Sequence, residues 1–212
     1  MTEDLIYGID VSHHNGTINW TKVKSSVPPV SFVYIKATQG IGYKDPANIV
    51  NANGAKAAGI KIGYYHFASL NNTADIAKDA TNEANWFNAT MKTLPASDLL
   101  PVLDIETNEK QLNTQQVQLW ISTFLNRMKE LGHMNMMLYS YKPFFDDNLP
   151  ANHPFGSIPL WLAQYRNVAA PSLPHGWTNY TVWQYSAKEK VSGINADCDM
   201  NKATQNFLEL PV

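Results

Sequence analysis

Short runs of β-branched and aromatic residues alternate with longer amphipathic segments along most of the chain. Runs of the first kind, bounded by Gly, Pro, Asn or Asp, are typical of strands. They predict strands at residues 6–11, 32–37, 62–68, 100–105, 136–140, 160–164 and 181–185, with a weaker eighth near 196–199.

Helical periodicity is clearest between Val117 and Leu131, where apolar residues recur at i, i+3, i+4 and i+7. Asn113 or Thr114 can cap the start of this helix, and Gly132 can end it. A second helix is predicted over about residues 73–91, and a third follows Asp45-Pro46 and stops at Gly59.

Strands that alternate with helices predict a parallel sheet, and seven or eight such units predict a small barrel of the (β/α)₈ type. The alternation fails near the C-terminus. The connection 165–180 contains Pro171, Pro174 and Gly176, and the connection 186–195 is shorter than a parallel crossover needs. We therefore expect an irregular α/β barrel with antiparallel closing strands. Without a repeat or linker, residues 1–212 form one predicted domain.

The composition is consistent with a single domain and excludes some classes of binding partner. Hydrophobic residues make up 44% of 212 residues, which is enough for one sizeable core. The net charge of −2 offers no basic field for nucleic acid. No run approaches the roughly 20 apolar residues of a membrane span. The segment Met1–Asp4 carries two acids, so we expect no secretory signal. We also expect a monomer.

Cys198 is the sole cysteine, which excludes an internal disulfide and a multi-thiolate zinc site. Its simplest role is that of a small apolar strand residue.

Carboxylic acids occupy the ends of several predicted strands, where an α/β barrel places its active site. Asp10 ends the first strand, Asp104 and Glu106 end the fourth, and Asp199 lies near the end of the chain. Residues i and i+2 of a strand face the same side, about 6.6 Å apart. Paired carboxyl groups at this range suit glycosidic cleavage, in which one acid donates a proton and a second group stabilises the cationic sugar carbon. We expect repulsion from Asp104 to raise the pKa of Glu106. An Asp-x-Glu pair alone is common, and the alternative is a strand end paired with a lysine.

Six segments in order resemble the successive conserved blocks of glycoside hydrolase family 25 muramidases. They read YGIDVSHHNG at 7–16, FVYIKAT at 32–38, GYYHFA at 63–68, LDIE at 103–106, LWLAQY at 160–165 and WQYS at 183–186. The resemblance covers nearly the whole chain. It implies an irregular β/α barrel that cleaves bacterial peptidoglycan between N-acetylmuramic acid and N-acetylglucosamine.

The resemblance implies that Glu106 is the catalytic acid and then base, with Asp104, Asp10 and Asp199 as acidic neighbours. Asp199 is preferred over Asp197 because the family's acid is followed two residues later by Asn. Asp104 would hold or polarise the substrate's 2-acetamido group, or stabilise the charge at the anomeric carbon. The strand spacing lies between the separations of retaining and inverting enzymes, and the acetamido group could itself be the nucleophile, so the stereochemistry is open.

Other polar and aromatic residues at strand ends could bind the substrate. Lys36 could bind a substrate carbonyl or a peptide-stem carboxylate, or pair with one of the aspartates. Rings and an amide that could line a sugar groove are Tyr65, Phe67, Tyr139, Trp161 and Gln184. Trp161 and Phe67 fit a core position equally well.

His13 and His14 invite a metal interpretation. A catalytic zinc normally has three protein ligands. Adjacent residues of an extended segment face opposite sides, so only one of the two histidines could lie beside the carboxylic acids of the site. We expect neither metal nor cofactor. Two alternatives are a metal-dependent polysaccharide deacetylase using Asp10, His14 and Asp104, and a catalytically inactive sugar-binding module.

The cellular context follows from the expected substrate. The protein would act on the bacterial cell wall, either as a phage endolysin that accumulates in the cytoplasm until lysis or as the mature domain of a secreted autolysin. Wall-binding repeats often accompany such domains, and no room for them follows Asp199.

Overall fold

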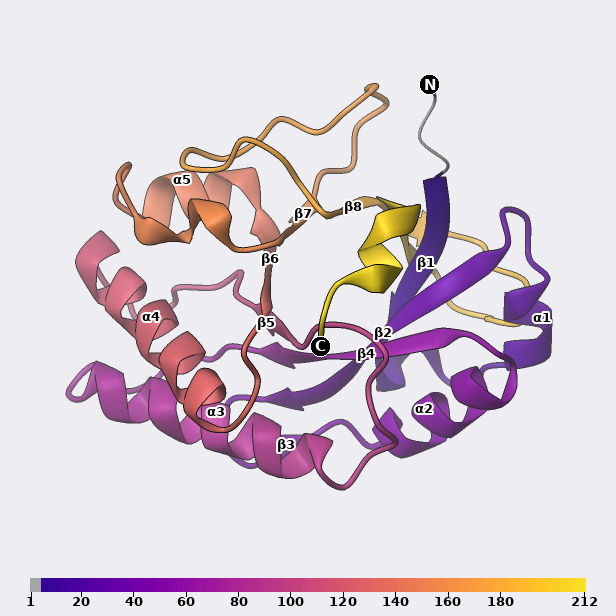
Figure 1. Ribbon diagram of the computed structural model, residues 1–212, viewed down its shortest axis with the longest axis horizontal. Helices are drawn as coiled ribbons and strands as arrows, with labels where there is room; N and C mark the ends of the chain where they lie inside the picture. Colours follow the sequence, from indigo (N-terminus) through magenta and orange to yellow (C-terminus); the bar gives the residue numbers. More distant parts are fainter. Residues whose placement is uncertain (1–4) are drawn as a thin grey trace.

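Eight strands close into a barrel in the computed structural model, which describes residues 5–212 (Figure 1). Each strand pairs with the next around the ring, and β1 closes it by pairing with both β2 and β9. A ninth strand, β3, forms a small antiparallel extension of β2. The strands are β1 (Leu5–Val11), β2 (Val30–Gln39), β3 (Tyr43–Lys44), β4 (Lys61–Phe67), β5 (Val102–Asp104), β6 (Met137–Tyr141), β7 (Leu160–Ala163), β8 (Val182–Glu189) and β9 (Cys198–Thr204).

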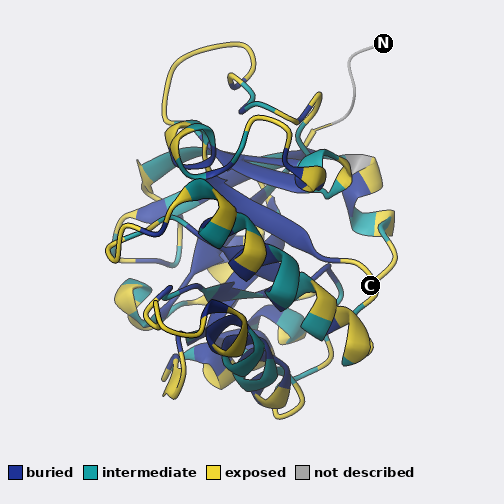
Figure 2. Cartoon of the chain, turned by 90° about the vertical axis from the view of Figure 1, so that its left-hand side faces the viewer, coloured by how far each residue is buried: buried dark blue, intermediate teal, exposed yellow. Residues whose placement is uncertain are grey.

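Helices cover the outside of the barrel unevenly. They are α1 (Trp20–Lys24), α2 (Asn48–Ala57), α3 (Ile76–Met91), α4 (Thr114–Glu130) and α5 (Lys142–Asn148), with short 3-10 turns η1 (His13–Asn15), η2 (Pro154–Ser157) and η3 (Gln205–Glu209). Helices α3 and α4 lie side by side, and their inner faces are buried against the sheet while their outer faces are exposed (Figures 1 and 2).

All eight predicted barrel strands and all three predicted helices are present, although β5 is shorter than predicted and β8 and β9 extend further toward the C-terminus. Asn113 caps α4 in a capping box with Gln116, as its sequence position predicts. Gly132 follows that helix with a φ of 102°, a conformation that glycine adopts without strain.

The prediction of antiparallel closing strands needs a correction. Strand β9 is antiparallel to both β8 and β1, as expected. Strand β8, however, runs parallel to β7. The connection 164–181 is long enough to return to the start of the sheet without a helix, so the lack of helical pattern there did not require a reversal.

Most buried apolar residues form one large core cluster. A separate, smaller cluster of side chains fills the inside of the barrel and closes one end. It joins inward-facing residues of several strands to Phe207 of η3, whose ring lies 4.9 Å from that of Phe32 and 6.3 Å from that of Tyr34. Gly63 makes room for this packing, since a Cβ there would lie 2.3 Å from the Tyr34 ring. Polar side chains lie at the end opposite η3, where the parallel strands terminate.

No helix within residues 5–212 is long and apolar enough to cross a membrane. The segment Met1–Asp4, on which the expectation of no secretory signal rests, lies outside the described residues. Cys198 is a free, buried thiol on β9.

Candidate active site

A cavity of about 420 Å³ opens at the carboxyl ends of the parallel strands. It contains every residue that the sequence nominated for the site. These are Asp10, Lys36, Tyr65, Phe67, Asp104, Glu106, Tyr139, Trp161, Gln184 and Asp199. The barrel therefore brings together residues from eight strand ends, as an α/β barrel is expected to do.

Asp10 and Asp199 form one acidic pair at this end of the barrel. They are opposite partners on the antiparallel strands β1 and β9. Asp10 is 7% exposed, and its Oδ2 accepts hydrogen bonds from Gln184 Nε2 at 2.9 Å and from Asn201 Nδ2 at 2.7 Å. Burial raises the pKa of Asp10 well above its ordinary value, and the charge of Asp199 adds to the rise, although the two amide donors oppose it.

A shell of side chains behind Asp10 orients the two amides. Tyr139 and Tyr165 donate their hydroxyls to Gln184 Oε1 at 2.8 and 2.5 Å. Trp161 donates its Nε1 to Asn201 Oδ1 at 2.7 Å. Both amide oxygens are thus occupied, so the NH₂ groups face Asp10. Three of the residues nominated as sugar contacts, Tyr139, Trp161 and Gln184, are buried and form the floor that holds this carboxyl group.

Asp104 and Glu106 form a second acidic pair across the end of β5. Asp104 is 5% exposed, and its Oδ1 is buried without a hydrogen-bond partner among the described residues, whereas Glu106 is half-buried. Burial raises the pKa of both carboxyl groups. The expected cause for Glu106 was wrong: the hydrogen bond with Asp104 lowers the pKa of Glu106, while burial, followed by the charge of Asp199, raises it.

Glu106 lies beyond the last residue of β5, on a segment without regular secondary structure. The preceding residue is held by the bond from Ile105 N to Tyr139 O at 3.0 Å. Tyr141, at the end of the neighbouring strand β6, donates its hydroxyl to the carbonyl oxygen of Glu106 at 3.0 Å. The Tyr141 ring packs edge-on against Phe144, with centroids 6.1 Å apart. A fixed ring therefore tethers the backbone of Glu106.

Lys36 lies on the β2 side of the cavity without forming an ion pair with the aspartates. Its Nζ donates to Gln39 Oε1 at 2.7 Å and lies 4.7 Å from the centre of the Phe67 ring. Burial lowers the pKa of Lys36, and the charges of Asp104, Asp45 and Glu106 counteract this effect. Tyr65 is half-buried beside it, with its ring edge-on to Trp161 at 6.5 Å.

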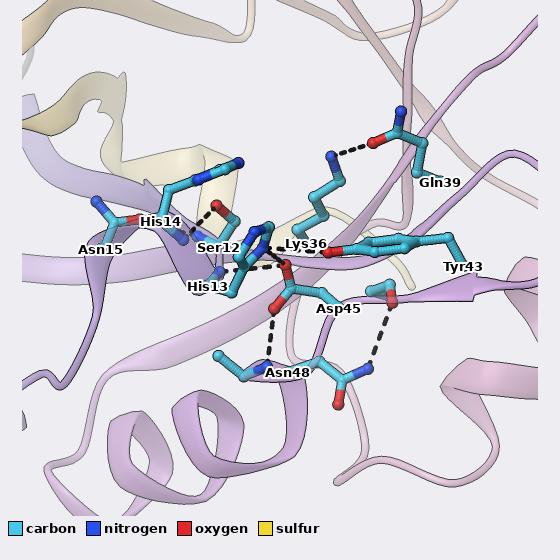
Figure 3. A network of polar contacts seen from close by, with 11 residues as sticks. Ser12, His13, His14, Asn15, Lys36, Gln39, Tyr43, Asp45 and Asn48 are labelled. Atoms are coloured by element: carbon cyan, nitrogen blue, oxygen red, sulfur yellow. Dashed lines mark hydrogen bonds and ion pairs between the residues drawn. The ribbon is translucent and has the colours of Figure 1, made fainter.

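The two histidines lie on the turn η1 and not on an extended segment, which corrects the geometry assumed from the sequence (Figure 3). His13 Nδ1 lies 2.7 Å from Oδ2 of the fully buried Asp45, and that oxygen also accepts from His13 N at 3.1 Å. The rings of His13 and His14 stay 3.9 Å apart, yet only His14 lines the cavity. Asp45 thereby ties η1 to the segment between β3 and α2.

Within residues 5–212, no three His, Cys, Asp or Glu side chains are placed to hold a metal ion. The geometry therefore gives no support to the metal-dependent interpretation built on Asp10, His14 and Asp104.

The structure separates the two candidate acids near the C-terminus. Asp197 is at the rim, where its carboxylate forms an ion pair with Lys190 and is 52% exposed. Asp199 faces Asp10, and burial raises its pKa, while a hydrogen bond from Asp10 lowers it. The position beside the other acids therefore belongs to Asp199.

Tyr141, Tyr165 and Asn201 support the site and were not nominated from the sequence, whereas His14, which was named there only for the metal-dependent alternative, lines the cavity. Asn201 carried a usable signal, because it lies two residues after Asp199 and would face the same side if the weakly predicted strand at 196–199 continued, as β9 does. Tyr165 follows a predicted strand directly. Tyr141 gave no signal, because its role depends on β6 lying beside β5.

Comparisons of the sequence and of the structure with known proteins indicate the same family. The sequence profile of Glycosyl hydrolases family 25 matches residues 9–194. The chain is 38% identical over 206 residues to Lysozyme M1 of Streptomyces globisporus, covering 93% of this chain and 67% of that protein. It is 32% identical over 201 residues to the autolytic lysozyme of Clostridium acetobutylicum, covering 95% of this chain and 56% of the relative. The crystal structure of the bacterial lysozyme from Streptomyces coelicolor superposes with a TM-score of 0.85 at 35% identity, covering 97% of this chain and 96% of that one.

Proposed function

This chain belongs to glycosyl hydrolase family 25, and from that membership we propose that it is a lysozyme-type muramidase that cleaves peptidoglycan between N-acetylmuramic acid and N-acetylglucosamine. Glu106 is the general acid that protonates the leaving oxygen and then the base that activates water. Asp104, Asp10 and Asp199 assist it.

The observation that carries this proposal is the position of Glu106 relative to Asp104. Glu106 is half-buried, with a pKa raised by burial, and it lines a cavity open to substrate. A general acid needs both a retained proton and access to the leaving group. Asp104 lies deeper, so it is less able to reach the glycosidic oxygen.

Asp104 has a different role in this proposal. Its Oδ1 has no partner among the described residues, although it is buried at the cavity wall. A buried polar atom in this state is costly unless a ligand satisfies it. We assign it the N–H of the substrate's 2-acetamido group, so that the acetamido oxygen is turned toward the anomeric carbon.

Asp10 contributes by staying fixed. Two amide donors with no freedom to turn hold it against Asp199. The charge of Asp199 in this second acidic pair raises the pKa of Glu106.

We also propose that residues 1–212 act as one catalytic domain on the bacterial cell wall. A single closed barrel includes every strand from β1 to β9 except β3, which extends β2, and the wall is where peptidoglycan lies.

The experiment that tests the function is a reducing-end assay on purified peptidoglycan. Wild type is compared with Glu106→Gln and with Glu130→Gln, which makes the same change on the exposed outer face of α4. Products are reduced with borohydride and identified by mass spectrometry. We expect reduced muramic acid ends from wild type and from Glu130→Gln, with a loss of about 100- to 10,000-fold for Glu106→Gln, the range typical for a general acid or base.

Other outcomes would contradict parts of the proposal. Reduced glucosamine ends would make the enzyme a glucosaminidase, and full activity of Glu106→Gln would remove the assigned proton donor. Loss of wild-type activity in a chelator would favour metal-dependent hydrolysis.

A further inference from the structure

A second groove lies next to the catalytic cavity. It has a volume of about 330 Å³ and shares Phe67 with the cavity. Loops that follow β2, β4 and β5 line it. The residues that matter below are Gln39, Phe67, Ser69, Asn71, Thr107 and Glu109. Thr107 and Glu109 belong to the segment that follows Glu106, so the groove adjoins the part of the catalytic cavity that Glu106 lines.

The wall formed by residues 69–71 is held by a buried network. Glu83 Oε2 accepts the backbone N–H of Ser69 at 3.1 Å and contacts His66 Nε2 at 2.7 Å. The other ring nitrogen of His66 lies 2.8 Å from Thr38 Oγ1. His66 and Glu83 are at most 1% exposed, so buried side chains fix the position of this wall.

The opposite wall, residues 107–109, is braced in a different way. Asn108 Nδ2 donates to Leu112 O at 2.8 Å and to Asn148 Oδ1 at 2.7 Å, and Asn108 Oδ1 accepts from Leu112 N at 2.8 Å. The loop is thus closed on itself and fastened to α5. Both walls exist before a ligand arrives, which lowers the cost of binding in the groove.

The groove combines hydrogen-bonding groups with two charges in a defined order. Amides and hydroxyls come from Gln39, Asn71, Ser69 and Thr107, and apolar surface comes from Phe67 and Leu70. At the entrance, the Lys36 ammonium lies over Phe67 and bonds to Gln39. On the loop beyond Glu106, the exposed carboxylate of Glu109 has no ion-pair or hydrogen-bond partner within the described residues.

The substrate of the proposed function contains one branch with matching chemistry. Muramic acid carries a lactyl group to which a stem peptide is attached by an amide bond. This peptide is a polyamide, and in its uncrosslinked form it presents a carboxylate near its start and a free amino group further along. An ammonium at the entrance followed by a carboxylate in the groove complements this order, whereas neutral N-acetylglucosamine would make no use of either charge.

We propose that the groove binds the stem peptide of the muramic acid unit held in the catalytic cavity, with Lys36 toward the peptide carboxylate and Glu109 toward the free amino group. This inference rests on the proposed muramidase function. The enzyme would then recognise the peptide branch as well as the glycan.

The test measures KM and kcat on three forms of one uncrosslinked peptidoglycan: intact, with its free amino groups acetylated, and with its stem peptides removed by an amidase. Wild type is compared with Glu109→Gln and Glu109→Lys. The matched controls Glu209→Gln and Glu209→Lys change an exposed carboxylate on η3, at the other end of the barrel.

We expect Glu109→Gln to raise KM on the intact form by about two- to fivefold with kcat unchanged, the range expected for one exposed ion pair. Glu109→Lys should raise it further, because attraction becomes repulsion. Neither variant should alter KM on the acetylated or stripped forms, and the Glu209 variants should match wild type throughout.

Two results would overturn the proposal while leaving the muramidase intact: unchanged KM of both Glu109 variants on the intact form, or an equal rise on the stripped glycan, which would assign the groove to a sugar unit. If wild type cleaves none of the three forms, the proposed function fails, and this inference fails with it.

Discussion

Tyr141→Phe removes one hydroxyl from the structure and leaves the ring in place against Phe144. The lost bond, from the hydroxyl to Glu106 O, is 3.0 Å long, and the Tyr141 residue is 37% exposed. A typical intramolecular hydrogen bond contributes about 0.5–1.5 kcal/mol, and partial exposure favours the lower part of this range. For a chain of this length, we expect the melting temperature to fall by only about 1–3 °C.

The effect on turnover should be larger than the effect on stability. The proton donor lies on an irregular segment, and catalytic geometry tolerates only about 0.5 Å of displacement. A displacement of about 1 Å can cost a factor of about 100. We therefore expect kcat to fall by about tenfold with KM nearly unchanged, since the ring surface offered to substrate is kept.

Tyr64→Phe is the matched control, because it removes a hydroxyl bond of the same kind. Tyr64 donates to Pro95 O at 2.7 Å, away from the cavity. We expect it to lower the melting temperature at least as much as Tyr141→Phe does, without changing kcat. Stability is measured by thermal denaturation, and kcat by reducing ends on soluble glycan strands. If Tyr141→Phe keeps kcat within twofold of wild type, or if Tyr64→Phe loses as much, Tyr141 does not position Glu106.

Two further predictions follow from the buried groups. Because burial raises the pKa of Asp104 above its ordinary value of 3.8, the folded state binds more protons than the unfolded state over the interval above that value, and this carboxyl group costs stability once pH rises through the interval. Asp104→Asn should therefore raise the free energy of unfolding at pH 7 and give little gain near pH 3, which urea denaturation at both pH values would check; equal gains at both would contradict the assigned cause. Burial also raises the pKa of the Cys198 thiol, so a disulfide reagent should modify it only after denaturant is added, and rapid labelling of the native protein would contradict its burial.

Much of the barrel could be predicted because its elements are long enough to show a period. Helix α4 has an apolar face and a cap at Asn113, and both signals are local. Helices α1 and α5 were missed, since five and seven residues are too few to establish a helical period. The direction of β8 was also beyond local pattern, because a long irregular connection can return the chain either way.

The acidic residues of the candidate site could also be predicted from local sequence. Asp10 and the pair Asp104 and Glu106 interrupt apolar strands at their ends, and such interruptions are visible in the sequence. Their supports were less visible: Asn201 acts on Asp10 only because β9 closes the barrel beside β1. Tyr141 reaches Glu106 only because β6 follows β5 in the sheet. Positioning residues depend on which strands become neighbours, which the period of a strand does not encode.

The pairing of Asp104 with Glu106 explains how a proton donor can work while its neighbour draws the proton away. In the free enzyme, the hydrogen bond between them raises the pKa of Asp104 and lowers that of Glu106, so it favours a proton on Asp104. Substrate bound over the half-buried Glu106 would displace water from it, and desolvation raises the pKa of a carboxyl group. An acetamido N–H donated to Asp104 would lower the pKa of that group. Both effects favour protonation of Glu106 over protonation of Asp104, so in the proposed mechanism substrate binding itself favours the protonated form of the general acid.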